Sequence, residues 1–202
     1  SVKPGEAIEI MVSTDPPQKF HIEIFRMGYY GGRGARLMTT LGPFQGEVQP
    51  TPPIGEKNIR ECLWKATARL EIPADWPSGV YLGRMSLLPP DENTGPWQSY
   101  VVFIVRDDRP ADILFQCSDN TWQAYNRWPD SYSLYIDPEN KRASCNNTVD
   151  VSFDRPYGKY VQIYQNPQSV GSGEFLCFEF PLCYWLEQHG YDVSYCSNSD
   201  ML

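Results

Sequence analysis

Short runs in which apolar and polar side chains alternate fill the first hundred residues. The alternation is clear over residues 7–12 and 20–25, and Pro16-Pro17 separates these two runs as a turn would. Three further runs cover residues 64–70, 79–85 and 100–105. A period of two places successive side chains on opposite faces of a sheet, while Pro and Gly favour the turns between strands. Residues 1–107 are therefore expected to fold as a β-sandwich of immunoglobulin-like size.

Two Gly- and Pro-rich segments interrupt these runs. Residues 26–36 contain four glycines, and residues 43–57 are expected to form a long connection. The glycines resemble a phosphate-binding loop in composition, but no helix-forming segment follows them and no Gly-Lys-Ser/Thr signature is present. We therefore expect a tight loop in which backbone approaches backbone.

The pattern changes at residues 106–110, where charged residues and a proline mark a predicted domain boundary. Beyond it, residues 112–117 form a short apolar run that is typical of a buried strand. Helical spacing covers residues 174–189, and Gly190 is a common helix stop. Residues 191–195 resemble a second strand.

Strand, helix, glycine and strand in this order are typical of a parallel α/β unit. We therefore expect residues 111–202 to form the first part of an α/β domain. A single unit of this kind cannot cover both faces of a parallel sheet, and its edges would be exposed. We expect further chain beyond Leu202 or a second chain to complete the sheet, and we expect the protein to be an oligomer.

The overall charge narrows the range of partners. The chain carries 17 Lys and Arg against 25 Asp and Glu, a formal net charge of −8. Nucleic acids and anionic membrane surfaces attract clustered basic side chains, so neither is expected as a partner. No apolar run approaches the ~20 residues that span a bilayer.

The six cysteines help to predict the cellular compartment of the protein. They are Cys62, Cys117, Cys145, Cys177, Cys183 and Cys196. Free thiols would suit a cytosolic enzyme, whereas three disulfides would indicate an oxidising compartment. The sequon Asn146-Asn147-Thr148 fits a glycosylated surface loop. Together these features favour an extracellular or periplasmic location slightly over a cytoplasmic one.

Two polar, aromatic segments form a candidate site. Residues 121–126 (Thr-Trp-Gln-Ala-Tyr-Asn) follow the predicted strand 112–117, with Asn120 or Thr121 as the expected cap of a short helix, and residues 152–157 (Ser-Phe-Asp-Arg-Pro-Tyr) come later. An unpaired buried polar group costs about 1–3 kcal/mol, so a cluster of such residues indicates a site. Open α/β sheets bind ligands beyond the carboxyl ends of their strands, where the first segment is expected. The alternative is a turn-rich surface patch.

Several segments, taken together, resemble the large (β) subunit of N,N-dimethylformamidase and its relatives. They lie at residues 25–32, 76–81, 103–107, 120–126, 152–157 and 185–192. The resemblance implies a sandwich domain followed by a domain similar to class I glutamine amidotransferases. It also implies an iron-dependent amidohydrolase-like protein, which hydrolyses a C–N bond of a small amide.

In the formamidase, two tyrosines and one glutamate hold a mononuclear iron. The resemblance makes Tyr125 the first candidate ligand in this sequence and Tyr157 the second. Four further tyrosines compete for these roles: Tyr132, Tyr135, Tyr160 and Tyr164. The family's glutamate belongs to a downstream segment that this chain does not contain, and Glu174 and Glu179 occupy different places in the pattern. The metal site is therefore expected to be incomplete in this chain alone.

The implied chemistry suits such ligands. Phenolate and carboxylate oxygens favour a hard cation such as ferric iron, which polarises an amide carbonyl and lowers the pKa of bound water. Asn120, Asn126 and Arg155 are candidate donors to the oxyanion of the tetrahedral intermediate. Arg155 has a structural alternative, an ion pair with Asp154 or a hydrogen bond to a loop carbonyl. For Tyr125 the alternative is an ordered or core aromatic residue.

Two other functions are weighed against this one. Cys117 follows a predicted strand and could act as a nucleophile with His21 or His189, although no nucleophile-elbow glycines surround it. A non-catalytic extracellular binding or structural protein on the same scaffold is the second alternative. The 6 Trp and 13 Tyr of this acidic chain suit stacking against sugar rings, although no carbohydrate motif is visible.

Overall fold

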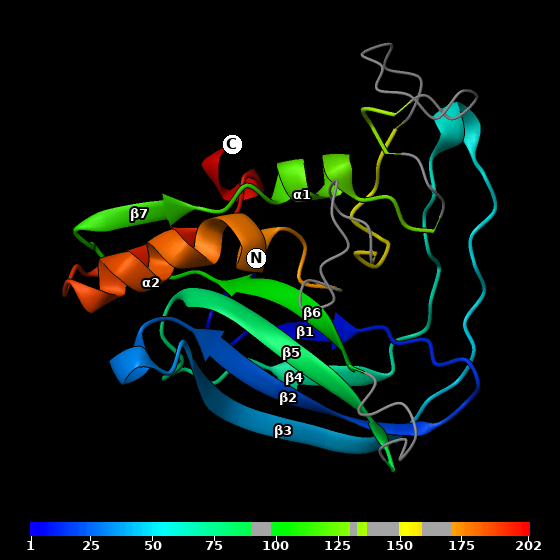
Figure 1. Ribbon diagram of the computed structural model, residues 1–202, viewed down its shortest axis with the longest axis horizontal. Helices are drawn as coiled ribbons and strands as arrows, with labels where there is room; N and C mark the ends of the chain where they lie inside the picture. The colour runs from blue at the N-terminus through cyan, green and yellow to red at the C-terminus, as the bar shows by residue number, and fades with distance from the viewer. Residues whose placement is uncertain (90–97, 130–132, 137–149, 159–170) are drawn as a thin grey trace.

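The computed structural model of the chain describes residues 1–89, 98–129, 133–136, 150–158 and 171–202. Figure 1 shows a β-rich molecule, and its described residues include two α-helices. The strands are β1 (Ala7–Ile10), β2 (Lys19–Met27), β3 (Ala35–Gln45), β4 (Ala68–Glu71), β5 (Gly79–Leu88), β6 (Gln98–Val105), β7 (Ile113–Gln116) and β8 (Val193–Cys196). The helices are α1 (Asp119–Tyr125) and α2 (Phe180–Gln188), with a π-helical turn, η4 (Phe175–Glu179), before α2 and short 3-10 turns at η1 (Tyr30–Gly32), η2 (Glu56–Asn58) and η5 (Ser199–Met201).

Four antiparallel strands in the order β3-β2-β5-β6 form the central sheet. A two-stranded antiparallel sheet, β1-β4, packs against one of its faces. Alternate residues of β2, namely Phe20, Ile22 and Ile24, are buried between the two sheets together with Ile10 and Leu70. The alternation in the sequence thus correctly identified β2 and its core face. The mixed, β-rich class is confirmed, while the immunoglobulin type of the sandwich stays a prediction.

The C-terminal half covers the opposite face of the central sheet. Val80 of β5 and Ile104 of β6 pack there with Trp122 of α1, Phe175 of η4 and Leu186 of α2. The first five residues of β5 are all buried, because this strand has a packed layer on each side. The predicted boundary at residues 106–110 lies where the chain passes from β6 to β7, and the division into domains 1–107 and 111–202 stays a prediction.

Strands β7 and β8 pair in parallel, with Ile113 opposite Val193 and Gln116 opposite Cys196. Both α-helices lie in the connection between them, which confirms the predicted order of strand, helix and strand. The helix expected over residues 174–189 is a π-turn followed by α2. Pro181 lies in the first turn of α2, where a missing N–H is tolerated, so the regular helix begins beside it. The N-cap of α1 is Ser118 rather than the expected Asn120 or Thr121.

The sequence did not predict β3, the edge strand of the central sheet. Its eleven residues run from the end of the glycine-rich segment into the expected long connection, and all of them are half-buried or exposed. An edge strand with few core contacts shows only weak alternation of apolar and polar side chains in its sequence. In addition, a β-bulge near Ile24 disturbs the register between β3 and β2. The glycine-rich segment before it is a tight loop, as expected, in which Gly28 N–H donates to the Gly34 carbonyl at 3.0 Å.

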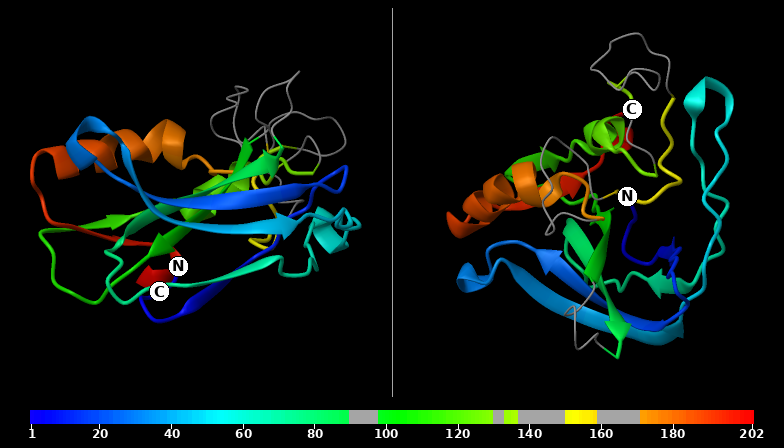
Figure 2. Two further views of the ribbon diagram at one scale, coloured as in Figure 1. Left: turned by 90° about the horizontal axis from the view of Figure 1, so that it is seen from below. Right: turned by 45° about the vertical axis from the view of Figure 1, so that its right-hand side comes forward.

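Residues 46–67 leave the two sheets and run as an arm beside residues 150–158, as the two views in Figure 2 show. Cys62 N–H donates to the Asp154 carbonyl at 2.6 Å, and Ser152 Oγ donates to Glu61 at 3.1 Å. The predicted strand over residues 64–70 is correspondingly short, because β4 starts only at residue 68. The arm therefore ties the N-terminal layers to the C-terminal half.

Five cysteines in the described part of the chain are free thiols: Cys62, Cys117, Cys177, Cys183 and Cys196. Cys145 and the sequon at residues 146–148 lie outside the described residues. None of the helices in the described ranges has the length and apolar character needed to cross a membrane.

Candidate functional site

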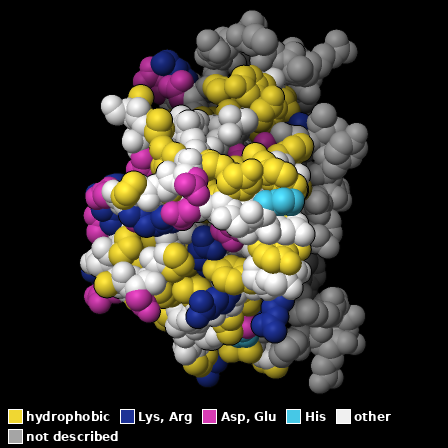
Figure 3. All heavy atoms as spheres, turned by 90° about the vertical axis from the view of Figure 1, so that its left-hand side faces the viewer, with side chains coloured by type: hydrophobic (Ala, Val, Ile, Leu, Met, Phe, Trp, Pro, Cys, Tyr) yellow, Lys and Arg dark blue, Asp and Glu magenta, His cyan; other side chains and the backbone are white. Residues whose placement is uncertain are grey.

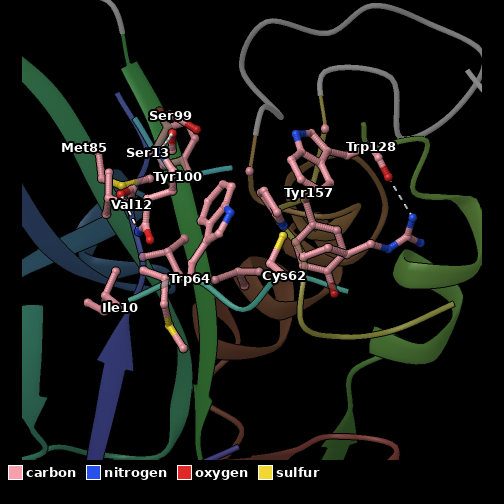
Figure 4. A pocket seen from close by; sticks show the side chains of 18 of the residues that line it. Ile10, Val12, Ser13, Cys62, Trp64, Met85, Ser99, Tyr100, Trp128 and Tyr157 are labelled. Atoms are coloured by element: carbon pink, nitrogen blue, oxygen red, sulfur yellow. Dashed lines mark hydrogen bonds between the residues drawn. The ribbon is translucent and has the colours of Figure 1, made fainter. Parts of the chain in front are cut away.

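A partly open cavity of about 1300 Å³ lies between the central sheet, the arm and the C-terminal half. Figure 4 shows side chains from all three regions around it. Tyr100 comes from β6, Cys62 and Trp64 from the arm, and Trp128 and Tyr157 from the segments after α1. The cavity therefore depends on the contact between the two halves of the chain.

The two candidate segments of the sequence meet beside this cavity through Gln123, which is 2% exposed. Arg155 donates from Nε to Gln123 Oε1 (3.1 Å) and from Nη2 to the Gln123 carbonyl (2.9 Å). Its Nη1 donates to the Trp128 carbonyl at 2.9 Å. The structural alternative for Arg155, hydrogen bonding to loop carbonyls, is thus present. The sequence analysis did not single out Gln123, although it lies about one helical turn before Asn126, the C-cap of α1.

Asn126 is fully buried and joins the same two segments. Its Nδ2 donates to the Pro156 carbonyl (2.9 Å), and its Oδ1 accepts from Gly158 N–H (3.0 Å) and Trp128 N–H (3.1 Å). These contacts fix the path of residues 156–158 against the end of α1. The side chain therefore satisfies backbone groups that would otherwise be buried without partners.

Asn120 lies elsewhere, on the exposed side of the first turn of α1. Its backbone N–H donates to Asn198 Oδ1 at 3.0 Å, and Asn198 N–H donates to Asp119 Oδ1 at 2.7 Å. The loops that follow β7 and β8 are thus joined at the carboxyl edge of the parallel pair. Asn120 does not line the cavity beside Tyr157 and Arg155.

Tyr157 lines the cavity and packs its ring edge-on against Trp122, with centroids 6.4 Å apart. Burial raises the pKa of its phenol above the usual range, and the charge of Asp119 adds to this. A hydrogen bond to Gln123 and the charge of Arg155 act in the opposite direction without cancelling the shift. The Tyr157 phenol is therefore neutral near pH 7.

Tyr125 lies on a different side of α1. Residues two apart on an α-helix are about 200° apart, so Tyr125 points away from Gln123, the partner of Tyr157. Its side chain is 37% exposed, and its ring lies against Tyr135 with centroids 4.9 Å apart. Within the part of the chain that the structure describes, Tyr125 is thus brought together with its competitor Tyr135. The other three competitors, Tyr132, Tyr160 and Tyr164, lie outside that part.

Glu179, the half-buried last residue of η4, contacts the carboxyl end of β7, and the sequence analysis did not select it. Glu179 Oε1 accepts from Ser118 N–H (3.0 Å) and Trp122 Nε1 (2.9 Å), and burial raises the pKa of this carboxyl. Its Oε2 is buried and has no hydrogen-bond partner in the described structure. Glu179 thereby fixes the start of α1. In the sequence, this role could have been inferred from the helical spacing between Glu179 and the apolar residues that form the core.

Cys117 follows β7 directly and is fully buried. Burial raises the pKa of its thiol well above the usual range, and the charge of Glu179 adds to this, which disfavours the reactive thiolate. His21 lies on β2, 3.6 Å from Glu23, and the His189 ring contacts Trp185. The geometry therefore gives no support to a Cys–His nucleophile.

Possible metal ligands are few in this structure. Among the described residues, no group of three or more His, Cys, Asp or Glu could hold a metal ion. Phenol oxygens remain as hard donors. The rings of Tyr125 and Tyr135 are in contact, with centroids 4.9 Å apart.

Comparison with known proteins identifies the family. The family model described as N,N-dimethylformamidase beta subunit-like, C-terminal, matches residues 21–202. No curated protein matches the chain. The matched range contains the central sheet except the first two residues of β2, together with both α-helices and the two candidate segments. The chain belongs to the N,N-dimethylformamidase beta subunit-like family.

Proposed function

We propose that the chain forms part of an amide hydrolase that cleaves a C–N bond in a small, formamide-like substrate. The observation that carries this proposal is the family match, which extends over residues 21–202. The cavity adds support, since small-molecule sites are concave, mostly apolar and often lie between domains.

We further propose iron as the cofactor, held in part by phenols of this chain. Tyr125 is the first ligand, and the second is either Tyr157 or Tyr135, whose ring Tyr125 contacts. A carboxylate from outside this chain completes the set. When bound, the metal would polarise the amide carbonyl and supply an activated water.

The remaining candidate residues have different proposed roles. The described donors of Arg155 and Asn126 bind backbone carbonyls and Gln123, so we propose that both residues position the segment 152–158 rather than contact the oxyanion. Asn120 is exposed at the carboxyl end of β7 and stays a candidate oxyanion donor. The aromatic walls of the cavity would hold the organic part of the substrate.

The proposed assembly follows from the incomplete parallel sheet. We propose that the first half is an immunoglobulin-like sandwich and that β7, β8 and their helices begin an amidotransferase-like domain, which further chain or a second chain completes. Phe178, Leu182 and Trp185 along α2 are 60%, 51% and 47% exposed. Figure 3 shows apolar side chains gathered on this side of the molecule. An oligomer that covers this surface fits the family's description as a subunit.

Metal analysis of the full-length native protein tests the iron proposal. We expect bound iron in the wild type, a large loss in Tyr125→Phe, and a second loss in either Tyr135→Phe or Tyr157→Phe. Tyr191→Phe is the matched control, because Tyr191 is exposed and packs against Trp185, away from the cavity. Absence of iron from the native protein, or full retention of iron in Tyr125→Phe, would remove the assignment.

A further inference from the structure

The aromatic side chains of the cavity meet at a corner. The rings of Trp64 and Trp128 are perpendicular, with centroids 5.8 Å apart. Tyr100 and Tyr157 line the same cavity, so the ring systems come from three regions of the chain (Figure 4). Trp64 Nε1 donates to the Pro50 carbonyl at 2.7 Å, which fixes the orientation of its indole. The corner therefore offers several preorganised aromatic surfaces to one bound group.

The charges around this corner are mostly negative. Among the described residues, the cavity is lined by four carboxylate side chains and one guanidinium. Asp154 lines the cavity beside the arm, where its carbonyl accepts from Cys62 N–H at 2.6 Å, two residues from Trp64. Asp119 lines the same cavity as Tyr157. Both walls of the corner thus have a carboxylate nearby.

The single guanidinium is directed at the protein itself. Arg155 donates from Nη1 and Nη2 to the carbonyl oxygens of Trp128 and Gln123, each at 2.9 Å. These carbonyls occupy its donors, while its positive charge remains. With four carboxylates against one guanidinium, the described lining is net negative and favours cations over carboxylates.

We propose that this cavity binds a small alkylammonium ion. Methyl groups around a positive nitrogen pack on aromatic rings, and the ring faces attract the charge, most strongly for Trp. Asp154, on the exposed side of the corner, supplies the opposite charge. A neutral molecule of the same shape gains only the apolar part of this interaction, and an anion is repelled.

The ligand class also connects the cavity to catalysis. Hydrolysis converts a neutral amide and water into a carboxylic acid and an amine, and an alkylamine with a pKa near that of lysine, about 10, is protonated at neutral pH. The cavity would hold this amine product while the acid product leaves. The role as a product site rests on the proposed amide hydrolysis, whereas binding of the cation does not.

Calorimetric titration of the full-length native protein with trimethylammonium chloride tests the proposal. The comparison ligand is tert-butanol, which has a similar shape and no charge, and ionic strength is held constant with sodium chloride. We expect trimethylammonium to bind and tert-butanol to bind at least about fivefold more weakly. Trp64→Leu and Asp154→Asn should each weaken trimethylammonium binding by about fivefold.

Matched controls separate the cavity from general surface effects. Leu37→Ala removes an exposed apolar side chain from β3, and Glu71→Gln removes an exposed carboxylate from β4; neither residue lines the cavity, and both variants should bind as the wild type does. If the Trp64→Leu variant fails to fold, the Asp154→Asn variant decides the test. Asp154 is exposed, so its replacement should not prevent folding.

Several results would overturn the proposal: no binding of trimethylammonium to the wild type, equal binding of tert-butanol, or unchanged affinity in Asp154→Asn. Amine release from amides is measured separately on the same protein. Hydrolysis without trimethylammonium binding would refute the cation site alone, and binding without hydrolysis would refute the hydrolase alone.

Discussion

Arg26 Nη2 and Glu187 Oε1 lie 2.9 Å apart in a buried ion pair that joins β2 of the central sheet to α2. Glu187 also accepts from Tyr29 N–H (3.0 Å) and from Tyr195 Oη (3.1 Å). Arg26 donates twice to the Ser78 carbonyl. Two of the segments that resemble the formamidase family, residues 25–32 and 185–192, therefore meet at this pair.

Replacing Arg26 with Met should destabilise the protein by about 3–5 kcal/mol, because Glu187 would be left as a buried charge without its partner. Urea unfolding of the full-length protein measures this difference. The control is Lys3→Met, which removes the exposed pair between Lys3 and Asp108 and should cost about 1 kcal/mol or less. Equal losses of unfolding free energy in the two variants would contradict a stabilising role of the pair between Arg26 and Glu187.

Gly28→Ala should disturb the same junction by steric contact. A Cβ at this position would lie 2.1 Å from Glu187 Oε2 and 2.9 Å from Arg26 Nη1. Gly5→Ala is the comparison, since its φ of +87° disfavours alanine while no atom lies within 4 Å of the added Cβ. We expect the larger loss of melting temperature for Gly28→Ala. A larger loss for Gly5→Ala would show that α2 moves aside without cost.

Asn126→Ala should loosen the segment 156–158 before it unfolds the protein. The variant leaves Gly158 N–H, Trp128 N–H and the Pro156 carbonyl without their partner, at about 1–3 kcal/mol for each group that stays buried. Hydrogen exchange at Gly158 should become faster, while exchange in β5 changes little. Asn120→Ala, on the exposed side of α1, should leave the Gly158 rate unchanged. An unaltered rate in Asn126→Ala would contradict the positioning role.

The rates at which the cysteines are alkylated should decrease as their burial and thiol pKa increase. Cys177 is exposed and should react first. Burial raises the pKa of Cys62 to about 11, so its rate should still be rising at pH 10, where an unperturbed thiol is already mostly ionised. Cys117, fully buried with a raised pKa, should react only after unfolding. Mass spectrometry after timed iodoacetamide treatment measures the order. Early labelling of Cys117 would contradict the packing around α1.

The sequence predicted the elements in which the positions of the apolar side chains match the positions that are buried. β2, β5, β6 and the parallel pair β7-β8 each have one or two packed faces, and their apolar patterns indicated them. β3 was missed because an edge strand with a bulge has little to bury. The helix predicted from residue 174 was placed too early, because residues 175–179 form a π-turn and α2 begins at Phe180, next to Pro181.

The contact between the two candidate segments is confirmed, while their role as a functional site stays a prediction. Residues 121–126 and 152–157 meet, as their shared polar and aromatic character suggested. The link between them is Gln123, whose importance depends on contacts more than thirty residues away and leaves no periodic signal. Trp64 reaches the cavity through the arm, a path that no local pattern indicates. Such long-range convergence is visible only once the chain is folded.

Amine release from N,N-dimethylformamide and other small N-substituted amides by the full-length native protein tests the central claim most directly. We expect release of the amine together with the acid, and a loss of this activity in Tyr125→Phe but not in Tyr191→Phe. An iron-containing protein that releases no amine from any of these amides, or a Tyr125→Phe variant as active as the wild type, would contradict the account.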